Sequence, residues 1–418
     1  MQQHASDRSS QQPTVLFFGN DWFAENRTSS HHIARWLARD HRVYYIECPG
    51  LRAPKTSGRD LKKIWSKVVR YAKGPRRAIE NVKVLTLLQI PLHRFRLVRW
   101  LNRTLILATL RCLEWREGIR RPIAWFMVPH LSSVVGRLGE SLSVYYCIDD
   151  YASLPDVNAQ AVRAMDEELT RKAGLVFVAS QTLLDAKSRL NPRAYVSPHG
   201  VDIDHFGRAR DDRLESPPEM VNLPRPIVGF FGLIEQWIDL DLVDELAARR
   251  PQWSIVLIGR MAVPDHPVCH RPNVHLLGKR PYDELPAYGR TFDAAIIPYR
   301  LTQQVLHANP IKLREYLAMG KAVVSVSTPE IDKYSEVVEI AHSREEFLAK
   351  LDAVLSRPST PAEIRRRVDR VAGESWDARL SHVMEIVQHH LQGKRVPEPV
   401  APAVELPGAV REDQGVRA

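Results

Sequence analysis

The chain has 418 residues, enough for two domains of ordinary size, and 44% of them are hydrophobic, as in a globular protein. It contains no run of about 20 apolar residues and no apolar signal-peptide core near its polar N-terminus, so we expect neither a membrane span nor secretion. The cysteines are scattered without metal-ligand spacing, which indicates reduced thiols in a cytoplasmic protein.

The net charge of +10 is concentrated in two basic stretches. Residues 52–77 carry ten Lys and Arg side chains against one acid, Asp60, and apolar residues fall at helical spacing among them. Residues 94–121 show the same mixture. Basic amphipathic helices of this kind bind anionic membrane surfaces, although a solvated helix face over the core gives the same pattern. No nucleic-acid-binding motif accompanies the charge, so we expect no nucleic-acid partner.

Apolar strands alternate with helical segments through the first half of the chain. Polar residues follow several of these strands directly, which is typical of a doubly wound parallel sheet with its site at the carboxyl ends of the strands. We therefore expect an α/β domain over residues 14–206, after a disordered N-terminus over 1–13. The predicted strands cover residues 14–18, 42–47, 82–88, 123–128, 143–148, 174–179 and 195–197, with a helix over 31–39.

The pattern restarts after residues 207–225, which are rich in charge, Pro and Ser and are predicted to be an interdomain linker. A second α/β domain is expected over 226–375. It is followed by an amphipathic helix over 376–392 and a disordered tail over 393–418. The predicted strands of this domain cover residues 227–231, 254–258, 274–277 and 294–297.

Residues 309–325 combine a helix with both ends marked and a buried strand. Asn309 is a good N-cap residue, and Gly320 is placed to end the helix in a left-handed turn. Lys312 and Glu315 are three residues apart and share one helix face. This pair suits a phosphorylated sugar, with Lys for phosphate and Glu for ribose hydroxyls, although an ordinary surface ion pair has the same spacing.

This segment resembles the donor-site signature of GT-B glycosyltransferases, Pro-x-Lys-x-x-Glu-Tyr-x-Ala-x-Gly-Lys-Pro-Val-Val, with Ala322 in place of the second proline. In the Glu-x7-Glu form of the signature, the first Glu falls on His307 here. The resemblance implies two Rossmann-like domains facing across a crevice, a C-terminal helix that crosses back, and Glu315 at the ribose of a nucleotide-sugar donor. It also implies retention of anomeric configuration.

The cations for the donor diphosphate are expected at the strand ends of the second domain. Arg260 and Lys279 each follow a strand and a glycine. Relatives carry an Arg and a Lys near the position of Gly232, which this chain lacks, and Tyr282 lies in a loop that contacts the base in relatives. Residues 231–242 further resemble bacterial polysaccharide-assembly enzymes of the teichuronic acid type. The expected donor-binding residues are Gly232, Arg260, Lys279, Tyr282, Asn309, Lys312 and Glu315.

Polar residues after the strands of the first domain are candidates for the acceptor side. A His or Asp there can orient or deprotonate an acceptor hydroxyl, although a lone His is often structural and Asp150 can instead cap the next helix. No Asp-x-Asp is flanked as in metal-dependent GT-A enzymes, and fixed cations can stabilise the leaving diphosphate, so we expect neither a metal nor a cofactor. The candidates are His130, Asp149 and Asp150 as catalytic residues, and Arg27, His31 and His32 on the acceptor side.

The leading hypothesis is a cytoplasmic glycosyltransferase on the inner face of the membrane. It would move a sugar from a nucleotide diphosphate to a lipid-linked or other glycan acceptor in cell-surface polysaccharide biosynthesis. A nucleotide-sugar epimerase of the same fold and a non-catalytic membrane-surface scaffold are the alternatives. The loop at residues 19–23 lacks Gly-x-Gly-x-x-Gly, which argues against a dinucleotide-dependent dehydrogenase.

Overall fold

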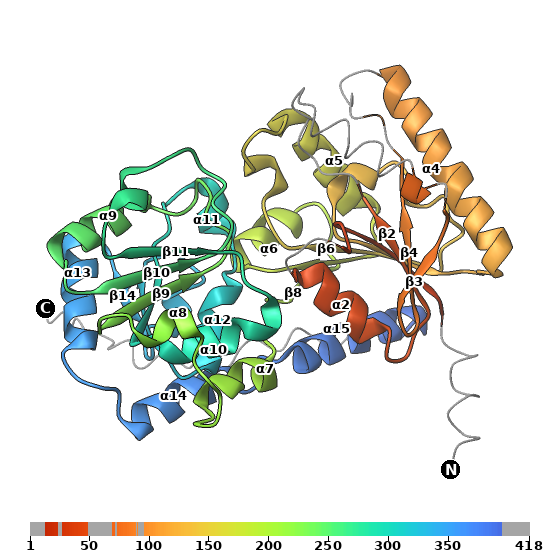
Figure 1. The fold of residues 1–418 in the computed structure, drawn as a ribbon. Coiled ribbons are helices and arrows are strands. Elements are labelled where there is room, and N and C mark those ends of the chain that lie inside the picture. Colours follow the sequence, from red (N-terminus) through yellow and green to blue (C-terminus); the bar gives the residue numbers. More distant parts are fainter. Residues whose placement is uncertain are drawn as a thin grey trace, which may run out of the picture.

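Two facing α/β domains, each built on one sheet, make up the protein in a computed structural model (Figure 1). The structure describes residues 13–23, 27–48, 69–71, 73–88, 90 and 96–394. The predictions for residues 1–12 and 395–418, and for most of the basic stretch 52–77, lie outside these ranges. The doubly wound α/β architecture expected from the sequence is confirmed.

The N-terminal domain contains an eight-stranded sheet in the order β3-β4-β2-β1-β5-β6-β7-β8, parallel except for the edge strand β3. The central strands are buried on both faces, which explains their continuous apolar sequences. Strand β3 was not predicted, because an exposed edge tolerates its arginines. The strands are β1 (Val15–Gly19), β2 (Val43–Glu47), β3 (Arg76–Ile79), β4 (Val82–Thr86), β5 (Ile123–Phe126), β6 (Leu142–Cys147), β7 (Leu175–Val178) and β8 (Ala194–Val196).

Helices cover both faces of this sheet. The first described helix starts two residues before its predicted position, because the backbone N–H of Thr28 donates to His31 Nδ1 (3.1 Å) and the pair closes the first turn. No described helix, including the longest, is both long and apolar enough to cross a membrane. The helices of this domain are α2 (Ser29–Leu37), α4 (Arg96–Glu117), α5 (Ala159–Lys172) and α6 (Gln181–Lys187).

The C-terminal domain contains a six-stranded parallel sheet in the order β11-β10-β9-β12-β13-β14. Its strands are β9 (Ile227–Phe231), β10 (Ser254–Ile258), β11 (Val274–Gly278), β12 (Ala294–Ile297), β13 (Ala322–Val326) and β14 (Glu339–Ala341). Its helices are α7 (Ile203–Gly207), α8 (Pro218–Val221), α9 (Leu240–Arg249), α10 (Leu285–Thr291), α11 (Gln303–His307), α12 (Ile311–Ala318), α13 (Arg344–Leu355) and α14 (Pro361–Val371).

The predicted linker, residues 207–225, is a packed part of the C-terminal domain. Ala209 and Met220 are buried in the core of that domain. Phe206, expected to end the first domain, is fully buried in the same core. The chain therefore crosses between the domains before α7, and the apolar residues set among the charges anchor the segment.

The last described helix, α15 (Trp376–Leu391), runs back from the C-terminal domain to the N-terminal one (Figure 1). Leu380, Val383 and Val387 are buried in the N-terminal core. The two crossing segments touch, because Trp376 N donates to Val201 O (3.3 Å). A Cβ on Gly200 would lie 2.6 Å from the Trp376 backbone, so this close approach requires glycine.

Candidate active site between the domains

The carboxyl ends of β9, β10 and β11 carry a row of glycines, Gly232, Gly259 and Gly278. Gly259 N donates to Gly278 O (2.8 Å), and Gly232 N donates to Ile258 O (2.8 Å). At Gly259 φ is +155°, and a Cβ there would lie 1.7 Å from Gly232 O, so no larger residue fits. The bare backbone leaves room for a ligand at the end of the sheet.

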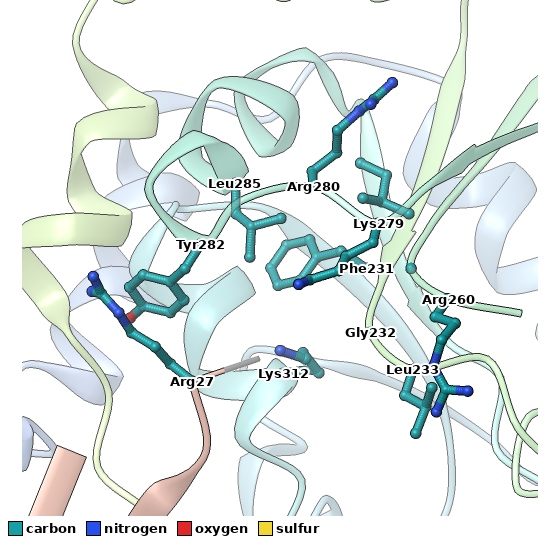
Figure 2. A pocket seen from close by; sticks show the side chains of 12 residues that line it. Arg27, Phe231, Gly232, Leu233, Arg260, Lys279, Arg280, Tyr282, Leu285 and Lys312 are labelled. Carbon is teal, nitrogen blue, oxygen red and sulfur yellow. The ribbon is translucent and has the colours of Figure 1, made fainter. Parts of the chain in front are cut away.

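A pocket lies over these glycines and receives cations from both domains; we call it the donor pocket. Lys279 and Lys312 extend into it, and Arg27 enters from the N-terminal domain beside Tyr282 (Figure 2). Arg260 also lines the pocket, but its guanidinium points away from the centre (Figure 2). Of the cations predicted for the diphosphate, the structure thus directs Lys279 and Lys312 into the pocket and leaves Arg260 at its edge.

Lys312 and Glu315 form the predicted pair. Lys312 Nζ donates to Glu315 Oε2 (2.9 Å) and lies 5.0 Å from the centre of the Phe231 ring. Glu315 is 3% exposed, and Lys312, not Glu315, lines the donor pocket. A ligand entering the pocket therefore meets the ammonium first.

The prediction that Asn309 caps α12 is wrong, because its amide has other partners. Asn309 Nδ2 donates to Glu330 Oε2 (2.8 Å), and Asn309 Oδ1 accepts from Arg314 Nη1 (2.8 Å). The N-cap residue is Pro310, whose side chain carries no hydrogen-bond acceptor. The other end of the helix is as predicted, with Gly320 in the left-handed conformation (φ +74°).

Tyr282, predicted to contact the base, supports Arg27 in this structure. Its ring stacks on His205, with ring centroids 4.3 Å apart, and the Arg27 guanidinium lies 4.6 Å from the ring centre. Burial raises the pKa of the Tyr282 hydroxyl. The ring thereby links the N-terminal arginine to the C-terminal domain.

A second pocket adjoins the donor pocket through Gly232 and Lys312 and reaches Asp149 at the end of β6. Asp149 Oδ1 is buried and has no hydrogen-bond partner among the described residues, while Oδ2 accepts from Gln304 Nε2 (3.4 Å). Burial raises the pKa of Asp149 to about 6. This carboxyl group is therefore poised to exchange a proton or a hydrogen bond with a ligand near neutral pH.

Asp150 caps the turn that follows β6, as the capping alternative predicted, and no observation tests its catalytic role. Its carboxylate accepts from Ala152 N (3.2 Å), from Ser153 Oγ (2.5 Å) and from His307 Nδ1 (3.1 Å) in the other domain. Burial raises the pKa of Asp150, but these partners outweigh it and the pKa is lowered.

The two histidines of α2 also have structural partners. His31 accepts from Thr28 N through Nδ1 and donates from Nε2 to Trp22 O (3.0 Å), so neither ring nitrogen is left for an acceptor. His32 stacks on Trp376, with centroids 5.0 Å apart. Burial, and next the charge of Arg27, lower the pKa of His32 to about 3, so its ring is neutral.

His130 lies in the turn after β5 and lines neither the donor pocket nor the pocket around Asp149. The structure instead adds His199, which follows β8 after Ser197 and Pro198 and was not among the predicted site residues. His199 lines the pocket around Asp149, and its Nδ1 lies 3.0 Å from Ser29 Oγ. Burial lowers the pKa of His199 to about 3.

Two facing Rossmann-like domains with a pocket at the strand ends between them have the architecture of the GT-B fold. Residues 225–357 match the family described as "Glycosyl transferases group 1". The resemblance drawn from the motif is therefore confirmed: the domain that carries Lys312 and Glu315 is of the group 1 glycosyltransferase type.

Among individual proteins, the chain is similar to the putative teichuronic acid biosynthesis glycosyltransferase TuaH of Bacillus subtilis (strain 168). The two are 23% identical over 395 residues, covering 87% of this chain and 94% of TuaH.

Solved structures show the same fold at low sequence identity. Sucrose-phosphate synthase (tll1590) from Thermosynechococcus elongatus has a TM-score of 0.66 at 13% identity, covering 92% of this chain and all of that one. Anabaena Alr3699/HepE, solved in complex with UDP and glucose, has a TM-score of 0.61 at 13% identity, covering 89% and 99% of the two chains.

Replacing Lys312 by Met should affect stability and binding separately. Glu315 would be left buried without its cation, so we expect K312M to lower the free energy of unfolding by about 3 kcal/mol, and K312M/E315Q to recover most of that loss. Nucleoside diphosphate affinity should fall at least tenfold in both variants. Denaturant unfolding and calorimetry test this, and normal affinity in the double variant would contradict the role of Lys312.

Proposed function

We propose that this enzyme transfers a sugar from a nucleotide diphosphate to a hydroxyl of a lipid-linked or other glycan acceptor in cell-surface polysaccharide biosynthesis. The observation that carries the proposal is that Lys312, Lys279 and Arg27, cations from both domains, line one pocket that also contains Gly232 and Gly259. The similarity to TuaH, named for teichuronic acid biosynthesis, supports the choice of pathway class.

In this proposal the cations bind the donor diphosphate and stabilise it as it leaves, so that no resident metal ion is needed. Glu315 binds the ribose hydroxyls. Lys312 Nζ donates a hydrogen bond to the Glu315 carboxylate in this structure, so donor binding requires the lysine to turn from Glu315 toward the diphosphate. Its four-carbon side chain, 23% exposed, has the freedom to do so.

On the acceptor side we propose that Asp149 accepts a hydrogen bond from the attacking hydroxyl. The bond from the anomeric carbon to the diphosphate breaks as the bond to the acceptor oxygen forms. With retention of configuration, both lie on one face of the sugar, and the acceptor proton passes to the leaving diphosphate oxygen. His199 lies in the same pocket as a neutral ring that adds no charge.

A thermal-shift screen with nucleotide sugars tests the class and identifies the donor. We expect one nucleotide sugar to stabilise the wild type by about 2.7 kcal/mol at 100 times its dissociation constant. Glu315→Ala should remain folded and lose this stabilisation, whereas Glu345→Ala, an exposed change on α13, should keep it.

Unchanged donor affinity in Glu315→Ala, measured by calorimetry, would overturn the ribose assignment. Product analysis with the donor alone separates the alternatives, because a free epimer would indicate an epimerase. A scaffold would bind no nucleotide at all.

The transfer rate should depend on the protonation of Asp149. Its pKa is raised to about 6, so the accepting carboxylate forms as the pH rises through that value, and kcat/KM should rise with it. Asp149→Asn should lose about 100-fold or more in kcat and lose this step in the pH profile. His130→Ala is the control, and an equal loss there would contradict the assignment.

We also propose that the outward face of α4 rests on an anionic membrane. Ile106, Leu110 and Leu113 of α4 are buried against the core, which agrees with the alternative that this basic stretch is a helix covering the core. On the outward side Trp100 is 53% exposed and Trp115 is 83% exposed, and exposed arginines accompany them. Tryptophan beside basic residues is typical of helices that lie in a membrane interface.

Vesicle flotation tests this surface. The wild type should float with vesicles that contain anionic lipid and not with neutral ones. Replacement of Leu97, Trp100 and Leu101 by Ser should reduce flotation severalfold, because these exposed side chains would enter the interface. Val221→Ser removes an exposed apolar group from the C-terminal domain and should have no effect. Equal loss in the control would contradict the proposal.

A further inference from the structure

A third pocket, which we call the arginine pocket, lies between α2 and the loop that carries Tyr282. Trp22, Arg27 and Arg35 line it from the N-terminal domain, and Lys279 and Tyr282 line it from the C-terminal one. Arg27, Lys279 and Tyr282 also line the donor pocket, whereas Trp22 and Arg35 line only the arginine pocket. It is therefore a distinct space that shares a wall with the donor pocket.

The arginine pocket has more positive than negative charge. Arg35 lies 5.3 Å from the centre of the Trp22 ring, and no described carboxylate forms an ion pair with it. Among the described carboxylates, Arg27 pairs with Asp283 alone (3.4 Å), whose side chain is 70% exposed, so water screens the pair. Burial, and next the charge of Arg27, lower the pKa of Arg35, so the two guanidiniums repel each other.

Two carboxylates beside Trp22, half-exposed Asp21 and buried Glu47, form ion pairs with Arg70 and not with Arg27 or Arg35. Arg70 Nη1 lies 3.5 Å from Asp21 Oδ1 and 3.6 Å from Glu47 Oε2. Glu47 also accepts hydrogen bonds from Trp22 N (3.0 Å) and from Thr86 Oγ1 (2.5 Å). Among the described side chains, Arg35 thus has no ion-pair partner, and Arg27 has only the exposed Asp283.

The ring of His32 shows how closely these cations gather. The charges of Arg27, Arg35 and Lys312 are among those that lower the pKa of His32. Lys312 lines the donor pocket, Arg35 lines the arginine pocket, and Arg27 lines both. A diphosphate in the donor pocket can engage Lys312 and Arg27. Arg35 lies outside that pocket and would still lack an anion.

We propose that the arginine pocket binds a phosphate or diphosphate group of the acceptor, an inference that rests on the proposed function. Guanidinium groups form paired hydrogen bonds with phosphate oxygens, and two of them face this space. Trp22 and Tyr282 supply flat apolar walls for whatever the phosphate carries. The phosphate can belong to a lipid-linked diphosphate or to a soluble sugar phosphate.

The test uses the full-length protein with the donor pocket saturated by the nucleoside diphosphate found in the screen. Farnesyl diphosphate and glucose 6-phosphate are then titrated in separate calorimetric experiments. We expect one of them to bind despite the nucleotide. Arg35→Gln should weaken that binding at least tenfold while changing nucleotide affinity less than twofold. Arg39→Gln, an exposed change at the end of the same helix, is the matched control and should bind like wild type.

The outcomes separate this inference from the proposed function. Preference for farnesyl diphosphate indicates a lipid-linked acceptor, and preference for glucose 6-phosphate a soluble one. Failure of both anions to bind, their displacement by the nucleotide, or normal binding to Arg35→Gln each overturn the arginine-pocket proposal alone. If no nucleoside diphosphate binds, the proposed function fails, and titration of the anions without nucleotide still tests Arg35.

Discussion

Buried Arg314 fixes the helix that presents Lys312 and Glu315 to the donor pocket, and the geometry of the site depends on it. Its Nε donates to Glu374 Oε2 (2.6 Å), and its Nη1 donates to Asn309 Oδ1 (2.8 Å). A buried guanidinium is tolerated only when its charge and its donors are matched, so these partners have little freedom to move. Arg314 thus anchors one face of α12 while the other face remains available to ligands.

The two hydrogen-bond partners of Arg314, Glu374 and Asn309, connect it to other parts of the structure. Glu374 immediately precedes α15, so the crossing helix is tied to α12. Asn309 binds Glu330, whose Oε1 accepts from Gln181 N (3.0 Å) at the start of α6 in the N-terminal domain. A change in the angle between the domains must therefore break charged hydrogen bonds that also position the donor pocket. This connection couples acceptor-side movement to α12 by direct contact.

Local sequence features predicted most of the fold, and they located several residues that line the pockets between the domains. Strands buried on both faces appear as unbroken apolar runs, and polar residues at their ends, such as Lys279 and Asp149, mark the sheet edge. The cap prediction at Asn309 was wrong because its partners are remote in sequence. The two ring nitrogens of His31 instead bond Thr28 and Trp22 around the start of its own helix, which its position after β1 did not reveal. No local sequence pattern reports a partner in the other domain. Arg35 and His199 become candidate site residues only because residues of the C-terminal domain complete the pockets that they line.

A contact between the domains explains why the chain departs from the Glu-x7-Glu signature at His307. His307 faces Asp150, 157 residues away in sequence, and its Nδ1 donates to the Asp150 carboxylate (3.1 Å). A glutamate at this position would place two carboxylates together, which raises the pKa of one of them or forces them apart. The imidazole joins the domains instead, and the neighbouring Gln304 contacts Asp149 from the same short helix. In place of a motif carboxylate from the C-terminal domain, the pocket beside α12 is therefore lined by a carboxyl group of the N-terminal domain, Asp149, whose buried Oδ1 has no hydrogen-bond partner among the described residues.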